Sequence, residues 1–191
     1  MDAAGVADHR GQRDQVADRQ LSRAREIPGP ENRVIRIDIA NRQNLLSLDR
    51  RLLRRAVRAV LGEAGVADAE ISLAVVDDAA MRRLHHRYLG DDSATDVLSF
   101  VLDCRGGRLE GEVIVSAETA RSSAPRYRHS PAEELLLYVV HGTLHLIGCR
   151  DDTPAARAAM SRRQRRIVKD AMRPERGPAE RPPAHAPRRM R

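Results

Sequence analysis

Strand-like and helix-like segments alternate along residues 33–172, and this alternation constrains the fold more than any other feature of the sequence. Residues 33–40 (RVIRIDIA) alternate apolar and charged side chains, as a half-buried strand does. Further strands are predicted at three places, the last running into a helix: 69–77, 95–103 and 111–120. This order of elements predicts an α+β (mixed α/β) domain. We expect one mixed four-stranded sheet packed with about five helices.

Helices are predicted where apolar residues recur at helical spacing. Ser47 or Asp49 can cap a helix that continues to about Gly62, and a shorter helix is expected at 78–89. Residues 131–148 are strongly apolar, with Ser130 as N-cap and Pro131 at the first helical position. A last helix is expected at 153–172, and Asp152 is suited to cap it. The turn between the third and fourth strands is predicted at CRGGR, residues 104–108.

The two ends of the chain differ from its centre in composition. Residues 1–32 are polar and end in the breaker IPGPEN, so we expect an N-terminal extension that is largely disordered. Residues 173–191 combine five prolines with six arginines, a composition typical of a disordered tail. The predicted folded domain is therefore 33–172.

Composition excludes several classes of protein. No apolar run approaches the roughly 18–20 residues of a membrane-spanning helix, and the N-terminus lacks the apolar stretch of a signal peptide. Cys104 and Cys149 are too few for a disulfide framework, which favours a reducing cytoplasm. The lack of an apolar run of spanning length favours no membrane partner. The scarcity of aromatic residues disfavours a platform of interleaved rings for stacking bases. The net charge of +7 permits a nucleic-acid partner without identifying one.

The strongest chemical signal runs from His141 to Asp152 (HGTLHLIGCRDD). His141 and His145 are four residues apart on a helix, so their imidazoles lie on one face about one turn apart and can share a divalent ion. Gly148 allows the chain to end the helix and turn back, which brings Asp151 to the same ion. Three protein ligands with one open position are typical of a catalytic zinc site.

A single buried histidine more often hydrogen-bonds within a core than binds a metal, but two at this spacing followed by glycine and a carboxylate favour a metal site. Spacing prefers Asp151 over Asp152 as the third ligand. Cys149 is a ligand candidate by chemical type, although an ordinary place in an apolar turn is the simpler role.

The same spacing matches the H-E-x-x-H-x-x-G-x-x-H pattern of metzincin proteases except at two positions. Asp151 stands where the third histidine would be, which a zinc site accepts. Gly142 stands where the glutamate general base would be, and glycine cannot supply that chemistry. A peptidase with the metzincin mechanism is therefore disfavoured.

Three collinear motifs carry a resemblance to a known family. His141–Gly148 (HGTLHLIG) closely resembles the H-G-x-L-H-L-x-G-Y-D-H signature of the YbeY family, bacterial endoribonucleases that mature ribosomal RNA. Thr95–Phe100 (TDVLSF) looks like the family's T-D-V-L-S-F strand, and Gly111–Ser116 (GEVIVS) looks like its G-D-I-V-I segment. The resemblance covers roughly residues 33–172.

The resemblance implies a single zinc ion held by His141, His145 and, at the position of the family's third histidine, Asp151. It implies metal-dependent cleavage of single-stranded RNA and a part in 16S rRNA 3′ end maturation and ribosome biogenesis. It also implies work in the cytoplasm together with the small ribosomal subunit or its assembly factors.

The sequence departs from the family pattern at two places. The family's Tyr-Arg pair ahead of T-D-V-L-S-F is Tyr88-Leu89 here, and the Tyr-Asp pair after the glycine is Cys149-Arg150. The missing arginine is thought to help the reaction in the family. Arg150 can pair with a phosphate, and a solvated place in the turn suits it equally well.

The expected reaction is metal-assisted phosphodiester hydrolysis, with water or the adjacent 2′-hydroxyl as nucleophile. No residue stands out as general base; His85 and His86 are candidates only by chemical type. Asp96 is a candidate partner for a ligand histidine. A basic helix face that can hold a phosphate backbone, or simply be solvated, is formed by Arg82, Arg83 and Arg87.

Two other function classes stay open. The first is another zinc hydrolase, such as a peptidase, which would need a carboxylate base from outside the motif; Glu112 and Glu118 are the nearest. The second is a non-catalytic, zinc-binding ribosome-assembly factor, which the missing family arginine favours.

Overall fold

The structure, a computed structural model, describes residues 33–173, which form a four-stranded sheet and five helices. The sheet order is β1-β2-β4-β3, with bounds β1 Ile35–Asn41, β2 Asp68–Val76, β3 Val97–Arg105 and β4 Arg108–Ser116. β1, β2 and β4 are parallel, while β3 runs antiparallel to β4. The predicted α+β fold with one mixed sheet is confirmed. The disorder predicted for both tails falls on 1–32 and 174–191, which lie outside the described residues.

A two-residue turn joins β3 to β4. Gly106 and Gly107 have φ values of 59° and 77°, which suit the left-handed turns that match strand twist in hairpins. The predicted turn at 104–108 is therefore narrower in the structure, because Cys104 and Arg105 belong to β3 and Arg108 to β4.

Two helices begin at their predicted capping residues, and the last helix has a different cap from the one predicted. Their bounds are α2 Arg50–Glu63, α3 Asp78–Leu89, α4 Ala117–Tyr127, α5 Pro131–Leu146 and α6 Pro154–Ala171. Asp49 caps α2, and Ser130 caps α5 with Pro131 in its first turn. The prediction that Asp152 caps the last helix is wrong. Thr153 does so, because its hydroxyl accepts the amide of Ala156 while the Asp152 carboxylate pairs with Arg150.

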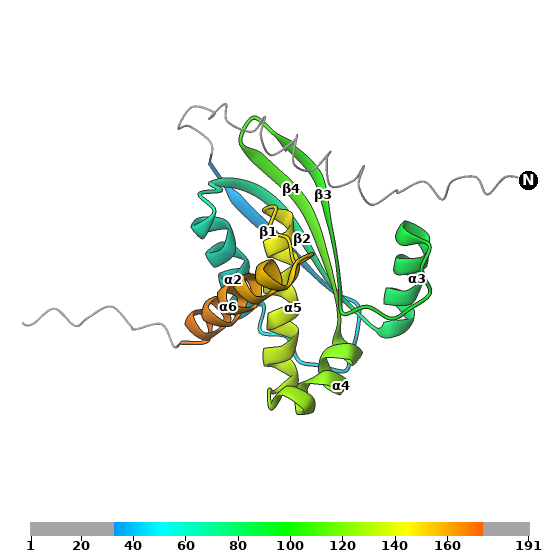
Figure 1. Cartoon of the computed structure of the whole chain (residues 1–191). Coiled ribbons are helices and arrows are strands. Elements are labelled where there is room, and N and C mark those ends of the chain that lie inside the picture. Colours follow the sequence, from blue (N-terminus) through cyan, green and yellow to red (C-terminus); the bar gives the residue numbers. More distant parts are fainter. Residues whose placement is uncertain (1–32, 174–191) are drawn as a thin grey trace, which may run out of the picture.

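The helices cover the two faces of the sheet unequally (Figure 1). α2, α5 and α6 share the main apolar core with one face, where Leu73 of β2 and Val113 of β4 are fully buried. α3 covers part of the other face through a small cluster formed by Val76, Met81, Leu98 and Ile114. Since α5 lies inside the main core, the histidines near its end are held by a rigid element.

α5 approaches the sheet closely at Gly142. A Cβ built on Gly142 would lie 2.7 Å from Val113 Cγ1 and 2.8 Å from Val97 Cγ2, distances that real Cβ atoms do not reach. Both valines stand on strands, and their side chains have little rotational freedom. Glycine at this position therefore sets how near α5 lies to β3 and β4.

An ion-pair cluster ties α2 to α6. Glu63 accepts two hydrogen bonds from Arg166, at 2.7 and 2.8 Å, and one from Arg163 at 3.1 Å. The hydrogen bond from Arg166, together with the further bonds and charges of the two arginines, lowers the pKa of Glu63 below its ordinary value, although burial opposes the shift.

We expect Glu63→Gln to destabilise the fold modestly near neutral pH, by about 0.5–1 kcal/mol, as other partly exposed ion pairs do. A lowered pKa in the folded state stabilises the protein above the pKa of the unfolded glutamate, and this stabilisation disappears as the pH falls through the lowered value. Thermal unfolding at several pH values should therefore show the difference from the parent shrinking in acid. Asp38→Asn, at an exposed position of β1, is the control. An equal difference at every pH would contradict the prediction.

Among residues 33–173, no helix combines the length and the hydrophobicity that crossing a bilayer requires.

Candidate metal centre

The last turns of α5 bring two imidazoles face to edge. The rings of His141 and His145 have centroids 4.6 Å apart at an interplanar angle of 86°, and their Nε2 atoms are 3.1 Å apart. Neither side chain is fully buried, so both remain reachable from the protein surface. Two ring nitrogens with lone pairs aimed at one point are a favourable start for a cation site.

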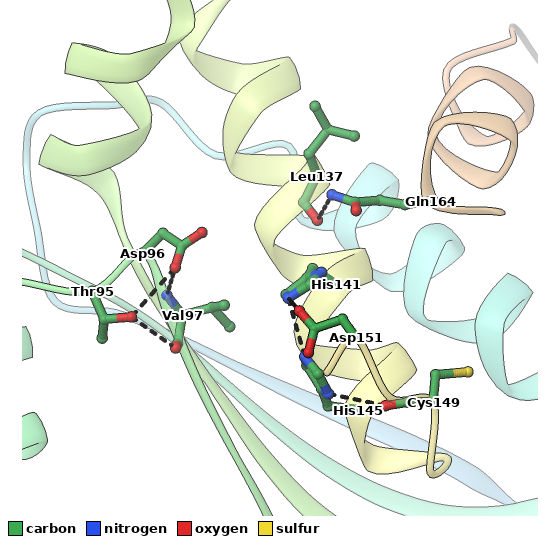
Figure 2. A network of polar contacts seen from close by, with 9 residues as sticks. All are labelled: Thr95, Asp96, Val97, Leu137, His141, His145, Cys149, Asp151 and Gln164. Carbon is green, nitrogen blue, oxygen red and sulfur yellow. Dashed lines mark hydrogen bonds and ion pairs between the residues drawn. The ribbon is translucent and has the colours of Figure 1, made fainter. Parts of the chain in front are cut away.

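A carboxylate completes the group after the chain turns back. Gly148 has φ of 82°, the left-handed conformation that ends the helix and redirects the chain. Asp151 Oδ2 then lies 3.8 Å from His141 Nε2, and the ligand atoms of His141, His145 and Asp151 are all within 4.8 Å of one another. Figure 2 shows the three side chains pointing toward a common position.

The same turn orients His145. Its Nδ1 lies 3.0 Å from the backbone carbonyl oxygen of Cys149. A carbonyl oxygen only accepts hydrogen bonds, so Nδ1 is the nitrogen that carries the proton, and Nε2 is left with its lone pair toward His141 and Asp151. This backbone contact is the kind of outer support that fixes the tautomer of a metal-binding histidine.

His141 is held in its neutral form mainly by burial. Burial lowers the pKa of the His141 imidazole, and the nearby His145 lowers it further. Asp96, Asp151 and a hydrogen bond with Gln164 of α6 oppose the shift. Gln164 is itself fixed, because its amide nitrogen donates to the carbonyl oxygen of Leu137 at 2.9 Å (Figure 2). A neutral imidazole at physiological pH is the form that binds a metal.

The donor set fits a tetrahedral ion with one open position. Bonds of about 2.0–2.1 Å to zinc imply ligand atoms roughly 3.3 Å apart in a tetrahedron. The observed separations of 3.1 Å between His141 and His145 and 3.8 Å between His141 and Asp151 lie on either side of that value. Since all three ligand atoms lie within 4.8 Å of one another, the side chains must draw somewhat closer to bind an ion together.

The other candidate ligands near the motif point elsewhere. The Cys149 thiol lies 3.2 Å from a guanidinium nitrogen of Arg163 in α6. Its sulfur points away from the two histidines (Figure 2). Asp152 is exposed and pairs with Arg150 at 3.0 Å. The structure thus brings Asp151, rather than Asp152 or Cys149, to the two histidines. Arg150 stands in the same turn as Asp151, with about half of its side chain exposed.

The position of Gly142 explains why this chain shares the histidine spacing of the metzincins but lacks their glutamate general base. The missing Cβ at this position points at Val113 and Val97 of the sheet. A glutamate there would enter the core between α5 and the strands and could not reach the histidine face of the helix. The packing of the fold therefore excludes the metzincin base. The alternative bases, Glu118 and Glu112, also lie away from the histidines. Glu118 accepts a hydrogen bond from the backbone amide of Asp78 at the start of α3. Glu112 points to the face of the sheet opposite to that of Val113.

The structure does not bring the predicted residues of α3 to the metal ligands. His85 hydrogen-bonds to the Ser93 carbonyl oxygen, and His86 pairs with Asp92. Leu89, where the family carries its arginine, is 44% exposed at the end of α3. The predicted basic face consists of Arg82, Arg83 and Arg87. All three are exposed, and none of them lines the pocket that contains His141. A role of these residues in catalysis or RNA binding stays a prediction.

That pocket combines one residue that the motifs indicated, Asp96, with others that they did not. It has a volume of about 710 Å³ and is lined from the segment just before β3 and from α4, α5 and α6, with Asp96 and Gln164 beside His141. The Asp96 carboxylate accepts a hydrogen bond from the Val97 amide at 3.0 Å. Its predicted interaction with a ligand histidine is electrostatic, because its negative charge raises the pKa of His141. Gln164 was missed because α6 shows no motif, and only the fold places it beside α5.

Comparison with known proteins agrees with this geometry. A family model described as endoribonuclease YbeY matches residues 38–172. Endoribonuclease YbeY of Moorella thermoacetica is 44% identical over 128 residues, which cover 61% of this chain and 82% of that protein. Endoribonuclease YbeY of Rhodopirellula baltica is 41% identical over 112 residues, which cover 58% of each chain.

A solved structure supports the fold independently. The solution structure of a Thermotoga maritima protein superposes with a TM-score of 0.50 at 23% identity, covering 72% of this chain and 89% of the other. The family match covers most of the chain and includes both histidines and Asp151. The chain is therefore a member of the endoribonuclease YbeY family.

Proposed function

We propose that the protein is a zinc-dependent endoribonuclease specific for single strands, acting in 16S rRNA 3′ end maturation and ribosome biogenesis. The observation that carries the proposal is the convergence of His141, His145 and Asp151 beside a pocket, in a chain of a family whose members are named endoribonucleases. Ribosomal partners, namely the small subunit or its assembly factors, and a cytoplasmic location follow from this role.

Zinc is the metal that the donor set favours. Two imidazole nitrogens and one carboxylate oxygen suit zinc, whereas magnesium and calcium prefer oxygen ligands throughout. When bound, zinc would supply a Lewis acid for a phosphoryl oxygen and lower the pKa of a coordinated water toward about 7. The chain's own contribution is to hold the ligands: α5 fixes His141, the Cys149 carbonyl orients His145, and the turn after Gly148 presents Asp151.

Basic side chains around the site suit an RNA backbone. Arg165 lines the pocket that contains His141, and Arg150 lies in the turn that carries Asp151. Arginine pairs with phosphate oxygens through two hydrogen bonds at once. The exposed arginines of α3 lie outside the pocket. We assign them a contact with more distant phosphates of the same RNA strand.

The test is cleavage of defined oligoribonucleotides by the full chain loaded with one zinc per molecule. Substrates are a single strand that includes the 3′ end of 16S rRNA, the same strand in a perfect duplex, and its DNA counterpart. We expect cleavage of the single-stranded RNA, little cleavage of the others, and loss of activity with a chelator that zinc restores. An intact single strand with zinc fully bound would overturn the proposal and favour the non-catalytic assembly factor. Cleavage of peptides alone would favour the other hydrolase.

Replacing Asp151 tests the third ligand. We expect Asp151→Asn to weaken zinc binding by more than the roughly 10–100-fold that changes to outer partners of metal ligands cost. Asp151→His, which restores the family's histidine, should keep about one zinc per chain. Asp152→Asn is the matched control, because Asp152 pairs with Arg150 and lies outside the ligand group. Metal titration against a competing chelator measures all three. Unchanged affinity in Asp151→Asn would transfer the ligand role to another group.

A further inference from the structure

The pocket that begins at His141 continues well beyond the metal ligands. Its far end is formed where α4 turns into α5, by Tyr127, His129 and Glu134, with Arg165 on the α6 side. A second hollow of about 490 Å³ shares His129, Leu137 and Arg165 with the first and continues along α6. Because they share these residues, we treat the two hollows as one groove. Its outer part carries Arg165, Lys169 and Arg173 against a single acidic residue, Glu133.

A buried polar cluster forms the base of this far end. Glu134 is only 4% exposed although it is a carboxylate, and its Oε2 lies 2.6 Å from His129 Nδ1. Tyr138, 8% exposed, hydrogen-bonds with Ser123 and Glu134. Burial raises the pKa of Tyr138 to about 12, so its hydroxyl keeps its proton at any physiological pH. A carboxylate is rarely buried to this degree unless it is paired. The partner of Glu134 is His129, which lines the pocket.

The carboxylate fixes which way His129 presents its nitrogens. Because Glu134 accepts from Nδ1, a neutral His129 keeps its lone pair on Nε2, which is then an acceptor for an N–H group. His129 is partly exposed and lines both hollows. Glu134 is in this sense a positioning residue, and His129 is the group available to a ligand.

The distance along α5 decides between catalysis and recognition. Glu134 and His141 are seven residues apart, two helical turns, which corresponds to about 10.5 Å. A general acid or base must come within about 2.6–3.2 Å of the proton it transfers, directly or through one water. His129 at the Glu134 end is therefore too far away to act on a phosphate at the metal ligands, but it is well placed to contact a neighbouring nucleotide of the same strand.

An aromatic surface stands beside His129. The Tyr127 ring lies 6.2 Å from the His129 ring, at an angle of 31°, and Tyr127 is 56% exposed. Between them Arg128 has φ of 59°, the left-handed conformation that a non-glycine residue adopts only at an energetic cost. The chain thus maintains an unfavourable backbone conformation at the turn that places these two rings at one mouth of the groove.

We propose that Tyr127, His129, Glu134 and Tyr138 form a nucleoside subsite that binds the base of a nucleotide flanking the scissile phosphate; the inference rests on the proposed endoribonuclease function. The base stacks on Tyr127 and donates an N–H group to His129 Nε2, and Tyr138 keeps Glu134 in place. The strand then continues along α6, with its phosphates beside Arg165 and Lys169. Base stacking and a basic groove are the usual means of binding a single strand.

The experiment is a scan with oligoribonucleotides in which one nucleotide at a time lacks its base. Zinc-loaded full chain is compared with Tyr127→Ala and with Tyr88→Ala, an exposed tyrosine of α3 outside the pocket. Binding is followed by fluorescence anisotropy in the cold before cleavage begins, and kcat/KM for cleavage is measured separately. In the parent we expect loss of one base beside the cleavage site to weaken binding about tenfold, the size of a single stacking contact.

The variants then locate that contact. Tyr127→Ala should bind intact RNA about tenfold more weakly and should no longer respond to removal of that base. Glu134→Gln should reduce the same response while zinc content stays at one per chain, which a general loss of folding would not produce. Tyr88→Ala should keep the response of the parent.

The outcomes separate this inference from the proposed function. If Tyr127→Ala and Glu134→Gln respond to base removal as the parent does, the subsite is overturned while the nuclease activity stands. If the parent shows the base-dependent binding but leaves every oligonucleotide uncut, the subsite stands and the proposed nuclease function fails. A parent that binds RNA equally well with and without every base overturns the subsite whatever its activity.

Discussion

His141→Ala is expected to abolish both zinc binding and RNA cleavage while leaving the fold intact. The side chain supplies an Nε2 atom that lies 3.1 Å from His145 Nε2 and 3.8 Å from Asp151 Oδ2. With His141 removed, the remaining imidazole and carboxylate form a two-ligand site, which holds an ion far more weakly than three ligands do. The effect should exceed the roughly 10–100-fold that changes to outer partners of metal ligands produce.

The measurement combines metal analysis, circular dichroism and cleavage of single-stranded RNA on the same preparation. His85→Ala is the control, since His85 hydrogen-bonds to the Ser93 carbonyl oxygen and does not line the pocket of His141. We expect this variant to retain about one zinc per chain. Retention of zinc by His141→Ala with full activity would refute the role of His141 as a metal ligand.

Gly142→Ala is expected to be strongly destabilising for a change of a single methyl group. The new Cβ would meet Val113 Cγ1 at 2.7 Å and Val97 Cγ2 at 2.8 Å, so either α5 or the strands must move. Overpacking a well-packed core in this way costs about 1–3 kcal/mol. In a chain of this size each kcal/mol lowers the midpoint of thermal unfolding by roughly 2–4 °C.

Gly62→Ala is a matched control for that prediction. Gly62 lies in the last turn of α2, and a Cβ there would have no atom within 4 Å. Alanine is the better helix former by about 1 kcal/mol, so this substitution should leave stability unchanged or raise it. Thermal unfolding of both variants, with zinc removed by a chelator, isolates the packing effect. Equal midpoints for Gly142→Ala and the parent would show that α5 can shift without cost.

Local patterns predicted the elements well because their signals are confined to a few neighbouring residues. Period-two alternation indicated β1, and Asp49 and Ser130 indicated where α2 and α5 begin. The error at α6 has an equally local cause. Asp152 and Thr153 are both good caps, and the choice between them was decided by Arg150, which engages the Asp152 carboxylate.

The metal ligands could be predicted from sequence because all three fall within eleven residues of a motif. The rest of the pocket could not, because it is assembled from the segment before β3 and from three helices, α4, α5 and α6. The low aromatic content argued against a stacking platform, yet Tyr127 and Tyr138 line one pocket together. Gln164 and the Cys149 carbonyl carry no sequence signal for their contacts with His141 and His145, since a side-chain amide and a backbone oxygen occur everywhere.

The position of Asp151 between two helices has a mechanical consequence. His141 and His145 belong to α5, whereas Asp151 belongs to the segment that leads into α6, the helix that forms one wall of the groove. An ion bound by all three would link α5 to the segment that leads into α6. It would therefore help to fix the distance between the two helices and the width of the groove between them. Removing the ion would increase the mobility of the groove as well as that of the metal ligands. Metal depletion should therefore make the segment between α5 and α6 more sensitive to proteolysis even when no RNA is present.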